Sequence, residues 1–295
     1  METWTRFRRD PANGWASALL LVVLVTALLA PLVSPWKASE TSGEAFAPPN
    51  ASHWMGTDLH GRDLFVRVAA ASRLSLGIGT AGALLSVFLG TAWGTVAGIS
   101  GRRGDFLMMR IVDLVHAIPS VVLVLLALNL TEVAAARGAP GISGIADGLR
   151  RIVVLVSVIG GVSWPTLSRV VRAQVLALRE RPFVLASRAI GAGTFHVLRR
   201  HILPNLTGLL LVNLTLTLPA VLLQESFLSV LGLGIRPPEA SLGTLIADGA
   251  AQLNPVRVRI WLLAFPAFQL AALLWATGRL ADGLRRATDP DGPRP

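Results

Sequence analysis

The chain has 295 residues, of which 53% are hydrophobic and only 15% are charged. Soluble domains carry about 25% charged residues, so a single soluble domain is excluded, and the apolar content excludes a disordered chain. The net charge is +10, and Lys37 is the only lysine among the 27 basic residues. The chain has no cysteine, which excludes disulfides, zinc–thiolate centres and cysteine nucleophiles.

Long apolar blocks dominate the sequence. A helix needs about 20 mostly apolar residues to cross the hydrocarbon core of a bilayer. Six blocks approach that length, at residues 16–33, 74–99, 111–130, 152–171, 206–233 and 260–280. The sequence therefore predicts an all-α polytopic membrane protein with six transmembrane helices. Arg6, Arg8 and Arg9 precede the first block and no small-residue cleavage pattern follows it, which favours a retained span over a cleaved signal peptide.

Basic residues are concentrated on one set of connecting segments. The N-terminal tail, residues 100–110, residues 169–205 and the C-terminal tail hold most of them, so both termini are expected in the cytoplasm. We expect three regions: residues 1–73 with the tail, the first helix and an extracytoplasmic segment, residues 74–285 with the other five helices, and a cytoplasmic tail at 286–295.

Residues 82–98 carry a small side chain at every fourth position. A spacing of four places these residues on one helix face, where a neighbouring helix can approach closely. Simple tight packing is the commoner explanation for such a face, and a moving interface is compatible with it. The residues are Gly82, Ser86, Gly90, Gly94 and Gly98.

Several polar residues and prolines interrupt the apolar blocks. Asp113 and Glu225 are acids near or within spans, where such groups usually face protein or water. They are interpreted first as hydrogen-bonding groups within the bundle, while Asn213, Gln224 and Glu225 are candidates for lining a pore. Four prolines are expected to kink or interrupt helices, namely Pro119, Pro165, Pro219 and Pro266.

The chain lacks the motifs of an energy-converting or catalytic protein. A P-loop needs a glycine-rich turn followed by a lysine, and Lys37 follows Ser34-Pro35-Trp36 instead. The five histidines form no HExxH motif or i, i+4 pair, and no GxSxG turn is present, so no metal, cofactor or catalytic residue is assigned.

Residues 169–205 form the most informative segment. A helix-like run at 183–190 is broken by Gly191 and Gly193, and Thr194 can cap a second short helix reaching Arg200. Leu203-Pro204 marks the start of the next span. Two short helices suit a docking element for a partner protein, and a merely solvated basic loop is the alternative. The arginines are Arg169, Arg172, Arg179, Arg181, Arg188, Arg199 and Arg200.

This segment resembles the EAA loop of the integral-membrane subunits of ABC importers, whose pattern is EAA, three residues, Gly, nine residues and I-x-L-P. In register, the chain has Leu185-Ala186-Ser187, then Gly191, then His201-Ile202-Leu203-Pro204. Leu185 stands in place of the glutamate, Ser187 in place of the second alanine and His201 in place of the isoleucine. The run 200–205 is typical of the peptide/nickel branch of the family.

Three more segments resemble the C-type permeases of that branch. His53-Trp54-Met55-Gly56-Thr57-Asp58-Leu59-His60-Gly61-Arg62-Asp63 is similar to "H-x-x-GTD-x-x-GRD". Residues 225–234 resemble "E-x-x-LSFLGLG", and residues 283–290 resemble the "GD-x-LRDALDP" tail. The resemblance covers about residues 15–290 in consistent order.

The resemblance implies a permease subunit of an ATP-driven importer of dipeptides or oligopeptides, with the type I ABC importer transmembrane fold. Expected partners are a homologous B-type permease, two ATPase subunits that bind ATP and Mg²⁺, an extracytoplasmic substrate-binding protein and the lipid bilayer, but no nucleic acid. The expected location is the cytoplasmic membrane of a bacterium or archaeon. Nickel or another small solute is an alternative cargo, and a stand-alone channel or a membrane-bound enzyme is an alternative class.

The resemblance also assigns an ATPase-coupling site, with Phe195 and Leu198 as apolar anchors and arginines that orient the docking. Extracytoplasmic segments 54–73 and 236–255 are expected to contact the binding protein. The coupling residues are Ala186, Ser187, Gly191, Phe195, Leu198, Arg199, Arg200, His201, Leu203 and Pro204.

Overall fold

The computed structural model describes residue 7 and residues 10–138, 146–254 and 257–288. Among these, five helices are long and apolar enough to cross a membrane, or six if one bent pair counts as a span, which confirms the expected fold class. The elements are α2 (Pro11–Val33), α3 (Leu64–Ile99), α4 (Arg102–Ala117), α5 (Ser120–Ala136), α6 (Asp147–Arg179), α7 (Pro182–Ala189), α8 (Thr194–Val197), the π-helical turn η1 (Leu198–Ile202), α9 (Leu203–Val230), α10 (Leu242–Ala251), β1 (Leu253–Asn254), β2 (Arg257–Val258) and α11 (Ile260–Thr288).

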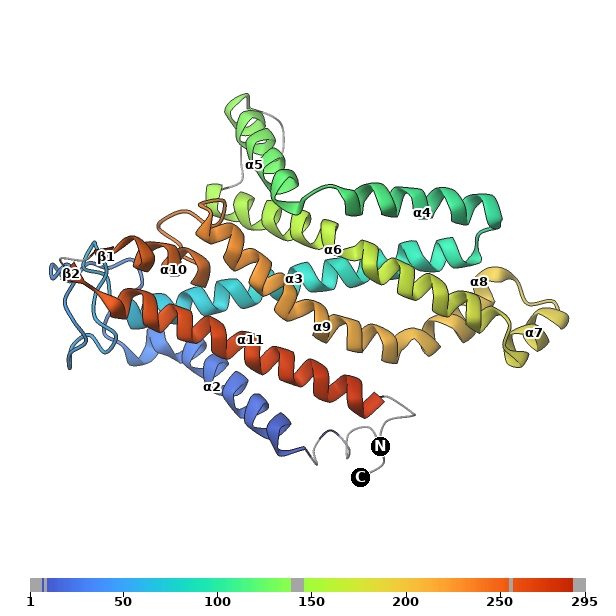
Figure 1. The fold of residues 1–295 in the computed structure, drawn as a ribbon, viewed down its shortest axis with the longest axis horizontal. Coiled ribbons are helices and arrows are strands. Elements are labelled where there is room, and N and C mark those ends of the chain that lie inside the picture. Colours follow the sequence, from blue (N-terminus) through green and yellow to red (C-terminus); the bar gives the residue numbers. More distant parts are fainter. Residues whose placement is uncertain (1–6, 8–9, 139–145, 255–256, 289–295) are drawn as a thin grey trace.

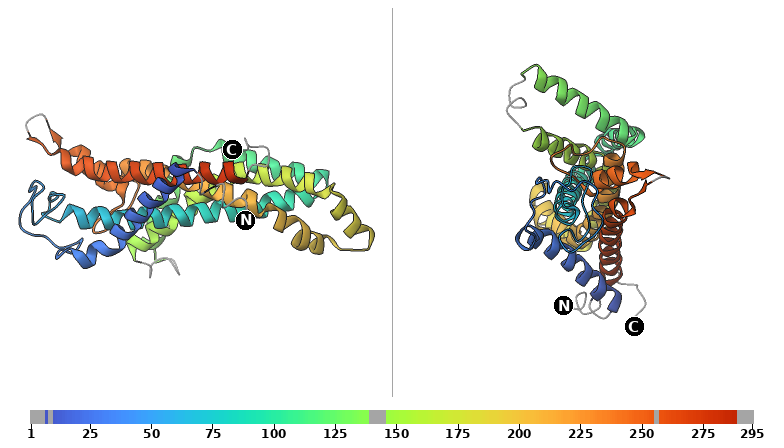
Figure 2. Two further views of the ribbon diagram at one scale, coloured as in Figure 1. Left: turned by 90° about the horizontal axis from the view of Figure 1, so that it is seen from below. Right: turned by 90° about the vertical axis from the view of Figure 1, so that its left-hand side faces the viewer.

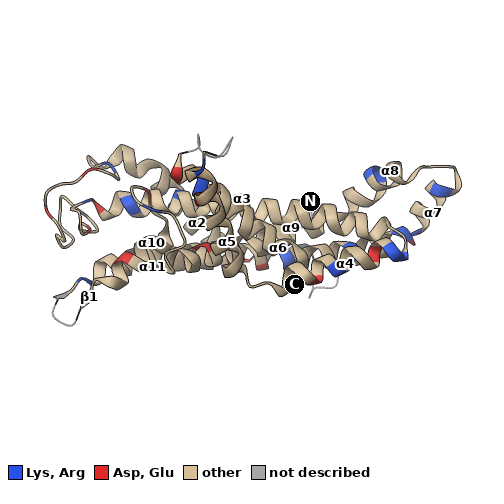
Figure 3. Cartoon of the chain, turned by 90° about the horizontal axis from the view of Figure 1, so that it is seen from above, with Lys and Arg blue, Asp and Glu red and all other residues tan. Residues whose placement is uncertain are grey.

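The long helices form an elongated bundle. Helices α3, α6, α9 and α11 run along the long axis, and α2 lies beside α11 (Figure 1). Helices α7 and α8 form one end of the bundle, while α10 and the antiparallel pair β1–β2 lie at the other (Figure 1). The end-on view in Figure 2 shows α5 standing away from the other helices. Lys and Arg gather on α7, α8 and the adjoining end of α6 (Figure 3), as expected for a segment outside the bilayer.

Aspartate side chains begin the first two spans. The carboxylate of Asp10 accepts a hydrogen bond from the Ala12 amide at 3.0 Å, and that of Asp63 accepts one from the Val66 amide at 3.0 Å. Each therefore satisfies an amide that the first turn of its helix leaves unpaired. Helix α3 begins ten residues before the expected start at Leu74, so the expected boundary between residues 73 and 74 lies inside it.

The third expected span, residues 111–130, is not one straight helix. Helices α4 and α5 meet at an angle of 84°, with the break at Ile118 and Pro119. Proline lacks an amide proton and its ring disfavours helical geometry at the preceding residue, so the helix ends there. Pro165, Pro219 and Pro266 instead lie inside the continuous helices α6, α9 and α11.

The small-residue face of α3 lies against α6. A Cβ on Gly90 would lie 3.0 Å from the carbonyl oxygen of Trp164, and one on Gly98 would lie 2.7 Å from Val175 Cγ1. A Cβ on Gly160 of α6 would in turn lie 2.8 Å from the Gly82 carbonyl oxygen. The two backbones therefore touch over most of the shared length, which larger residues would prevent.

Ion pairs hold α4 to α6. Asp113 accepts a hydrogen bond from Arg169 at 2.8 Å, and both side chains are exposed. One turn farther along α6, Arg172 binds both carboxylate oxygens of Asp105 through Nε and Nη2. Helix α4 thus carries two acids matched to two arginines of α6. Helix α5 contacts α6 through Val124 and Leu128 in an apolar cluster and through an ion pair between Glu132 and Arg151.

Candidate functional site

The predicted docking segment forms a compact helical tip. Helix α6 continues to Arg179, so the first third of residues 169–205 is helix and not loop. Two short helices follow, as predicted, but Gly193 and not Thr194 is the N-cap of the second one, and its end merges with α9 through a π-helical turn. We call α7, α8 and η1 together the coupling tip.

Gly191 ends α7 in a left-handed conformation, with φ of +93°. The Gly191 amide donates to the Arg188 carbonyl at 2.9 Å, and the Ala192 amide donates to the Ser187 carbonyl at 3.1 Å. This pair of bonds is the Schellman ending of a helix, which favours glycine because other residues are strained at positive φ. The glycine of the EAA-like pattern is therefore the residue that turns the chain from α7 to α8.

An apolar cluster fixes the tip to the long helices. Val184 of α7, Val197 of α8 and Ile202 of η1 are fully or almost fully buried among Leu167, Val171, Val175, Leu178 and Leu206. Leu198 packs partly buried against the same cluster and faces inward rather than outward. The tip is therefore packed directly onto α6 and α9 through well-packed apolar contacts that resist compression.

The outer surface of the tip is apolar with a basic rim. Ile190 is 87% exposed and Phe195 is 74% exposed, and Phe183 and Leu185 are also exposed. Exposed arginines lie on the same segments, and within the described part of the chain none of them forms an ion pair; they are Arg181, Arg188, Arg199 and Arg200. Large exposed apolar patches with a polar rim are typical of protein-binding sites.

The other expected coupling residues are divided between the surface and the interior. Ala186 and Pro204 are exposed, whereas Ser187 is buried and Leu203 is half-buried. His201 is half-buried, with its ring centroid 5.9 Å from that of Phe183 and 6.3 Å from that of His196.

Glu225 belongs to a buried hydroxyl cluster and not to a surface. It is 0% exposed, and its carboxyl oxygens accept hydrogen bonds from Ser75 Oγ at 3.1 Å and from Ser229 Oγ at 2.8 Å. Ser241 Oγ donates to Ser229 Oγ at 3.1 Å, and the Leu242 amide donates to Ser75 Oγ at 3.2 Å. The cluster joins α3 and α9 to the first turn of α10.

The other two pore candidates lie on α9 at partly buried positions. Asn213 Nδ2 donates to the Leu209 carbonyl of its own helix at 2.8 Å. Gln224 makes no side-chain hydrogen bond within the described residues. The structure therefore places Asn213, Gln224 and Glu225 in three different environments along one helix.

A second polar network lies before and within the first turns of α3. His53 Nδ1 is 2.8 Å from Asp63 Oδ2, and Asp58 Oδ2 is 2.7 Å from Arg62 Nε and 3.4 Å from Arg67 Nε. The sequence pattern marks residues 53–63 but gives no sign that Arg67 is buried.

The comparisons with known proteins agree with this architecture. Residues 90–291 match the family model described as "Binding-protein-dependent transport system inner membrane component". Residues 1–49 match the N-terminal transmembrane domain of oligopeptide transport permease C. The chain is a C-type permease of this family. As a permease it is a multi-pass membrane protein, in agreement with its apolar helices.

Close relatives extend along nearly the whole permease. The dipeptide transport system permease protein DppC of Bacillus subtilis (strain 168) is 37% identical over 290 residues, which cover 98% of this chain and 85% of that protein. The oligopeptide transport system permease protein OppC of the same strain is 37% identical, with 97% and 87% covered. OppC of Haemophilus influenzae is 36% identical, with 97% and 86% covered.

A solved structure shares the fold. A chain of the inward-facing MetNI methionine ABC transporter superposes with a TM-score of 0.56 at 19% identity, covering 77% of the permease and 98% of that chain. The permease therefore has the transmembrane fold of ABC importers.

Proposed function

We propose that the chain is a non-catalytic transmembrane subunit of a peptide importer in the cytoplasmic membrane. It would form the translocation path with a second, homologous permease, receive peptides from an extracytoplasmic binding protein and take its energy from two ATPase subunits. The names of the relatives DppC and OppC support dipeptides or oligopeptides as the cargo. The basic coupling tip supports an orientation with both termini in the cytoplasm.

The observation that carries the proposal is the outer surface of the coupling tip. Ile190 and Phe195 project into solvent from two short helices that are otherwise firmly seated on α6 and α9. The exposed arginines form no ion pair within the described residues, which favours acidic residues on the docking surface of the ATPase subunit. Closure of an ATPase dimer would move the tip, and the buried Val184 and Val197 would transfer that motion to α6 and α9 as a rigid body.

A pair of matched variants tests this docking. Phe195→Asp places a charge at the centre of the apolar patch, and Gln174→Asp places the same charge on an exposed position of α6 outside it. We expect Phe195→Asp to lose the copurified ATPase subunits and the substrate-stimulated ATP hydrolysis of the reconstituted transporter, whereas Gln174→Asp keeps both. Normal ATPase stimulation in the Phe195→Asp transporter would refute the docking site.

A further inference from the structure

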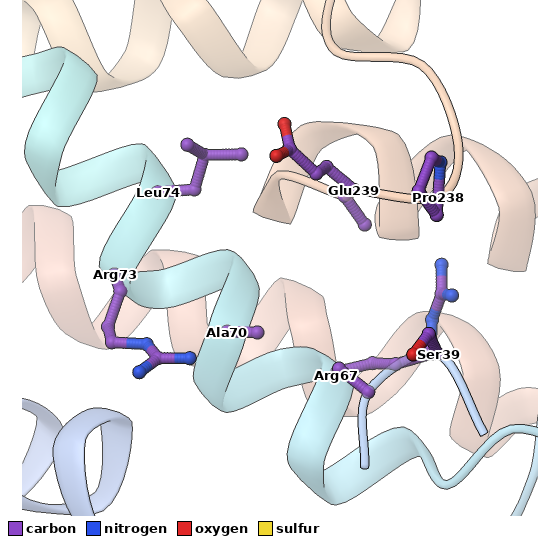
Figure 4. Close-up of a pocket in the computed structure, with 9 residues that line it drawn as sticks. Ser39, Arg67, Ala70, Arg73, Leu74, Pro238 and Glu239 are labelled. Atoms are coloured by element: carbon purple, nitrogen blue, oxygen red, sulfur yellow. The ribbon is translucent and has the colours of Figure 1, made fainter. Parts of the chain in front are cut away.

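A cavity of about 480 Å³ lies beside the first turns of α3, at the end of the bundle opposite the coupling tip. Helix α3 forms one wall, and the segment that leads into α10 forms the other (Figure 4). The apolar part of the wall includes Ala70, Leu74, Pro238 and Ala240, and the polar groups include Arg67 and Glu239.

Arg67 is a buried cation that its neighbours satisfy only in part. It is 3% exposed, and within the described residues its Nε and Nη1 atoms have no hydrogen-bond partner. Its ion-pair partner Asp58 is 3.4 Å away and gives its shorter contact, 2.7 Å, to Arg62. Asp248 of α10 is the other acid that interacts with Arg67 electrostatically. A buried charge without well-formed hydrogen bonds is costly, so a further anionic partner would stabilise it.

Figure 4 shows where that partner can be placed. The guanidinium group of Arg67 points across the cavity towards Pro238. The carboxylate of Glu239 points away from Arg67 and lies at the first turn of α6, where a Cβ on Gly148 would be 2.9 Å from Glu239 Oε2. Glu239 therefore leaves the cavity side of Arg67 open to a ligand.

We propose that this cavity binds the terminal carboxylate of a small peptide, held by the guanidinium group of Arg67. Because Nε and Nη1 are buried, Nη2 is the guanidinium nitrogen left to donate a charge-assisted hydrogen bond to a carboxylate in the cavity. The cavity volume lies within the range of about 300–1,000 Å³ that small-molecule pockets occupy. The cavity is therefore larger than a single acidic side chain requires. Apolar walls beside the arginine suit the side chains of a peptide. The choice of a peptide rests on the proposed function, while the carboxylate follows from Arg67.

The test measures the melting temperature of the full-length protein in detergent in the presence of three compounds. They are dialanine, alanylalanine amide, which lacks the carboxylate, and acetate. We expect dialanine to raise the melting temperature and the other two compounds to have a much smaller effect. Arg67→Gln and Ala70→Phe should each weaken the apparent affinity for dialanine about tenfold or more. Ala70→Phe fills the cavity and leaves Arg67 in place, so it tests the site even if the Arg67 variant folds poorly. Arg102→Gln, at an exposed position, is the matched control.

Three outcomes would overturn the proposal: no effect of dialanine at millimolar concentration, equal effects of dialanine and its amide, or unchanged binding in Ala70→Phe. Acetate binding as tightly as dialanine would overturn the assignment to peptides. Peptide uptake by the reconstituted transporter separates this proposal from the proposed function. Uptake without binding at Arg67 contradicts only the cavity site, and binding without uptake contradicts only the importer.

Discussion

Ser75 and Glu225 are 150 residues apart in sequence and share a buried hydrogen bond of 3.1 Å that joins α3 to α9. Ser75 Oγ accepts a bond from the Leu242 amide at the same time, so one hydroxyl connects three helices. Hydrogen bonds in a chain of this kind strengthen one another in a low-dielectric interior.

Removal of the Glu225 carboxyl group should therefore destabilise the bundle. Glu225→Ala leaves the hydroxyls of Ser75 and Ser229 without an acceptor, which is expected to lower the unfolding free energy by about 1–3 kcal/mol. Thermal unfolding of the purified protein measures this loss. Gln224→Ala should change the unfolding free energy little, because Gln224 makes no side-chain hydrogen bond within the described residues although it is the next residue in the chain. An equal loss in both variants would contradict the role of the cluster.

The contact of α3 with α6 predicts that methyl groups are tolerated on one face of α3 and not on the other. A Cβ on Gly94 would overlap the Ser168 carbonyl oxygen, whereas a Cβ on Gly77 meets nothing within 4 Å. Gly94→Ala should cost about 1–3 kcal/mol of stability, because the helices must separate. Gly77→Ala should be neutral or slightly stabilising. Denaturation of the two variants in the same detergent gives the comparison, and equal stabilities would rule out the close approach.

The left-handed Gly191 predicts a local effect at the coupling tip. Gly191→Ala is expected to destabilise the end of α7 by about 1–2 kcal/mol, since alanine is strained at positive φ. Amide hydrogen exchange in residues 184–192 should become roughly 5- to 30-fold faster. Gly193→Ala is the control, because its φ of −69° is ordinary and its Cβ would meet nothing within 4 Å. Unchanged exchange in Gly191→Ala would contradict the Schellman ending.

The pairing of Asp105 with Arg172 predicts rescue by exchange of the charges. Arg172→Asp places two acids side by side and should lower stability by about 1 kcal/mol, since both groups are partly exposed. The double variant Asp105→Arg, Arg172→Asp restores opposite charges and should recover part of that loss. Melting temperatures of the two single variants and the double variant form the cycle. Additive losses would show that the two residues are not coupled.

The absence of cysteine makes the proposed orientation directly testable. Ser39 and Thr194 are both exposed. Ser39 lines the cavity beside the first turns of α3, and Thr194 begins α8 at the opposite end of the bundle. In intact cells, a membrane-impermeant maleimide should label Ser39→Cys, while Thr194→Cys should react only after the cells are opened. The reverse pattern would place both termini outside.

The sequence predicted most helices because apolar length is a local property. It also predicted that Pro119 would kink or interrupt the third span, but the 84° angle between α4 and α5 could not be derived from local sequence. It started α3 too late, since Arg73 resembles a loop border. Arg67 lies within α3 and is buried beside the acid Asp58. The pairing of Arg172 with Asp105 spans 67 residues, and no periodic pattern reports such a contact.

The coupling tip shows the same division between local and long-range information. Gly191 and Pro204 stand at positions where local backbone rules require them, so the turn and the start of α9 were predictable. The inward direction of Leu198 was not, because it depends on a cluster contributed by α6 and α9.

The contact between the glycine face of α3 and α6 has a mechanical consequence. Helix α6, with 33 residues, is about 50 Å long and reaches from the coupling tip to the end where the Arg67 cavity lies. Where two backbones touch, no layer of long side chains remains to absorb a displacement by changing rotamers. We therefore expect α3 and α6 to move together as one rigid unit when the coupling tip is displaced.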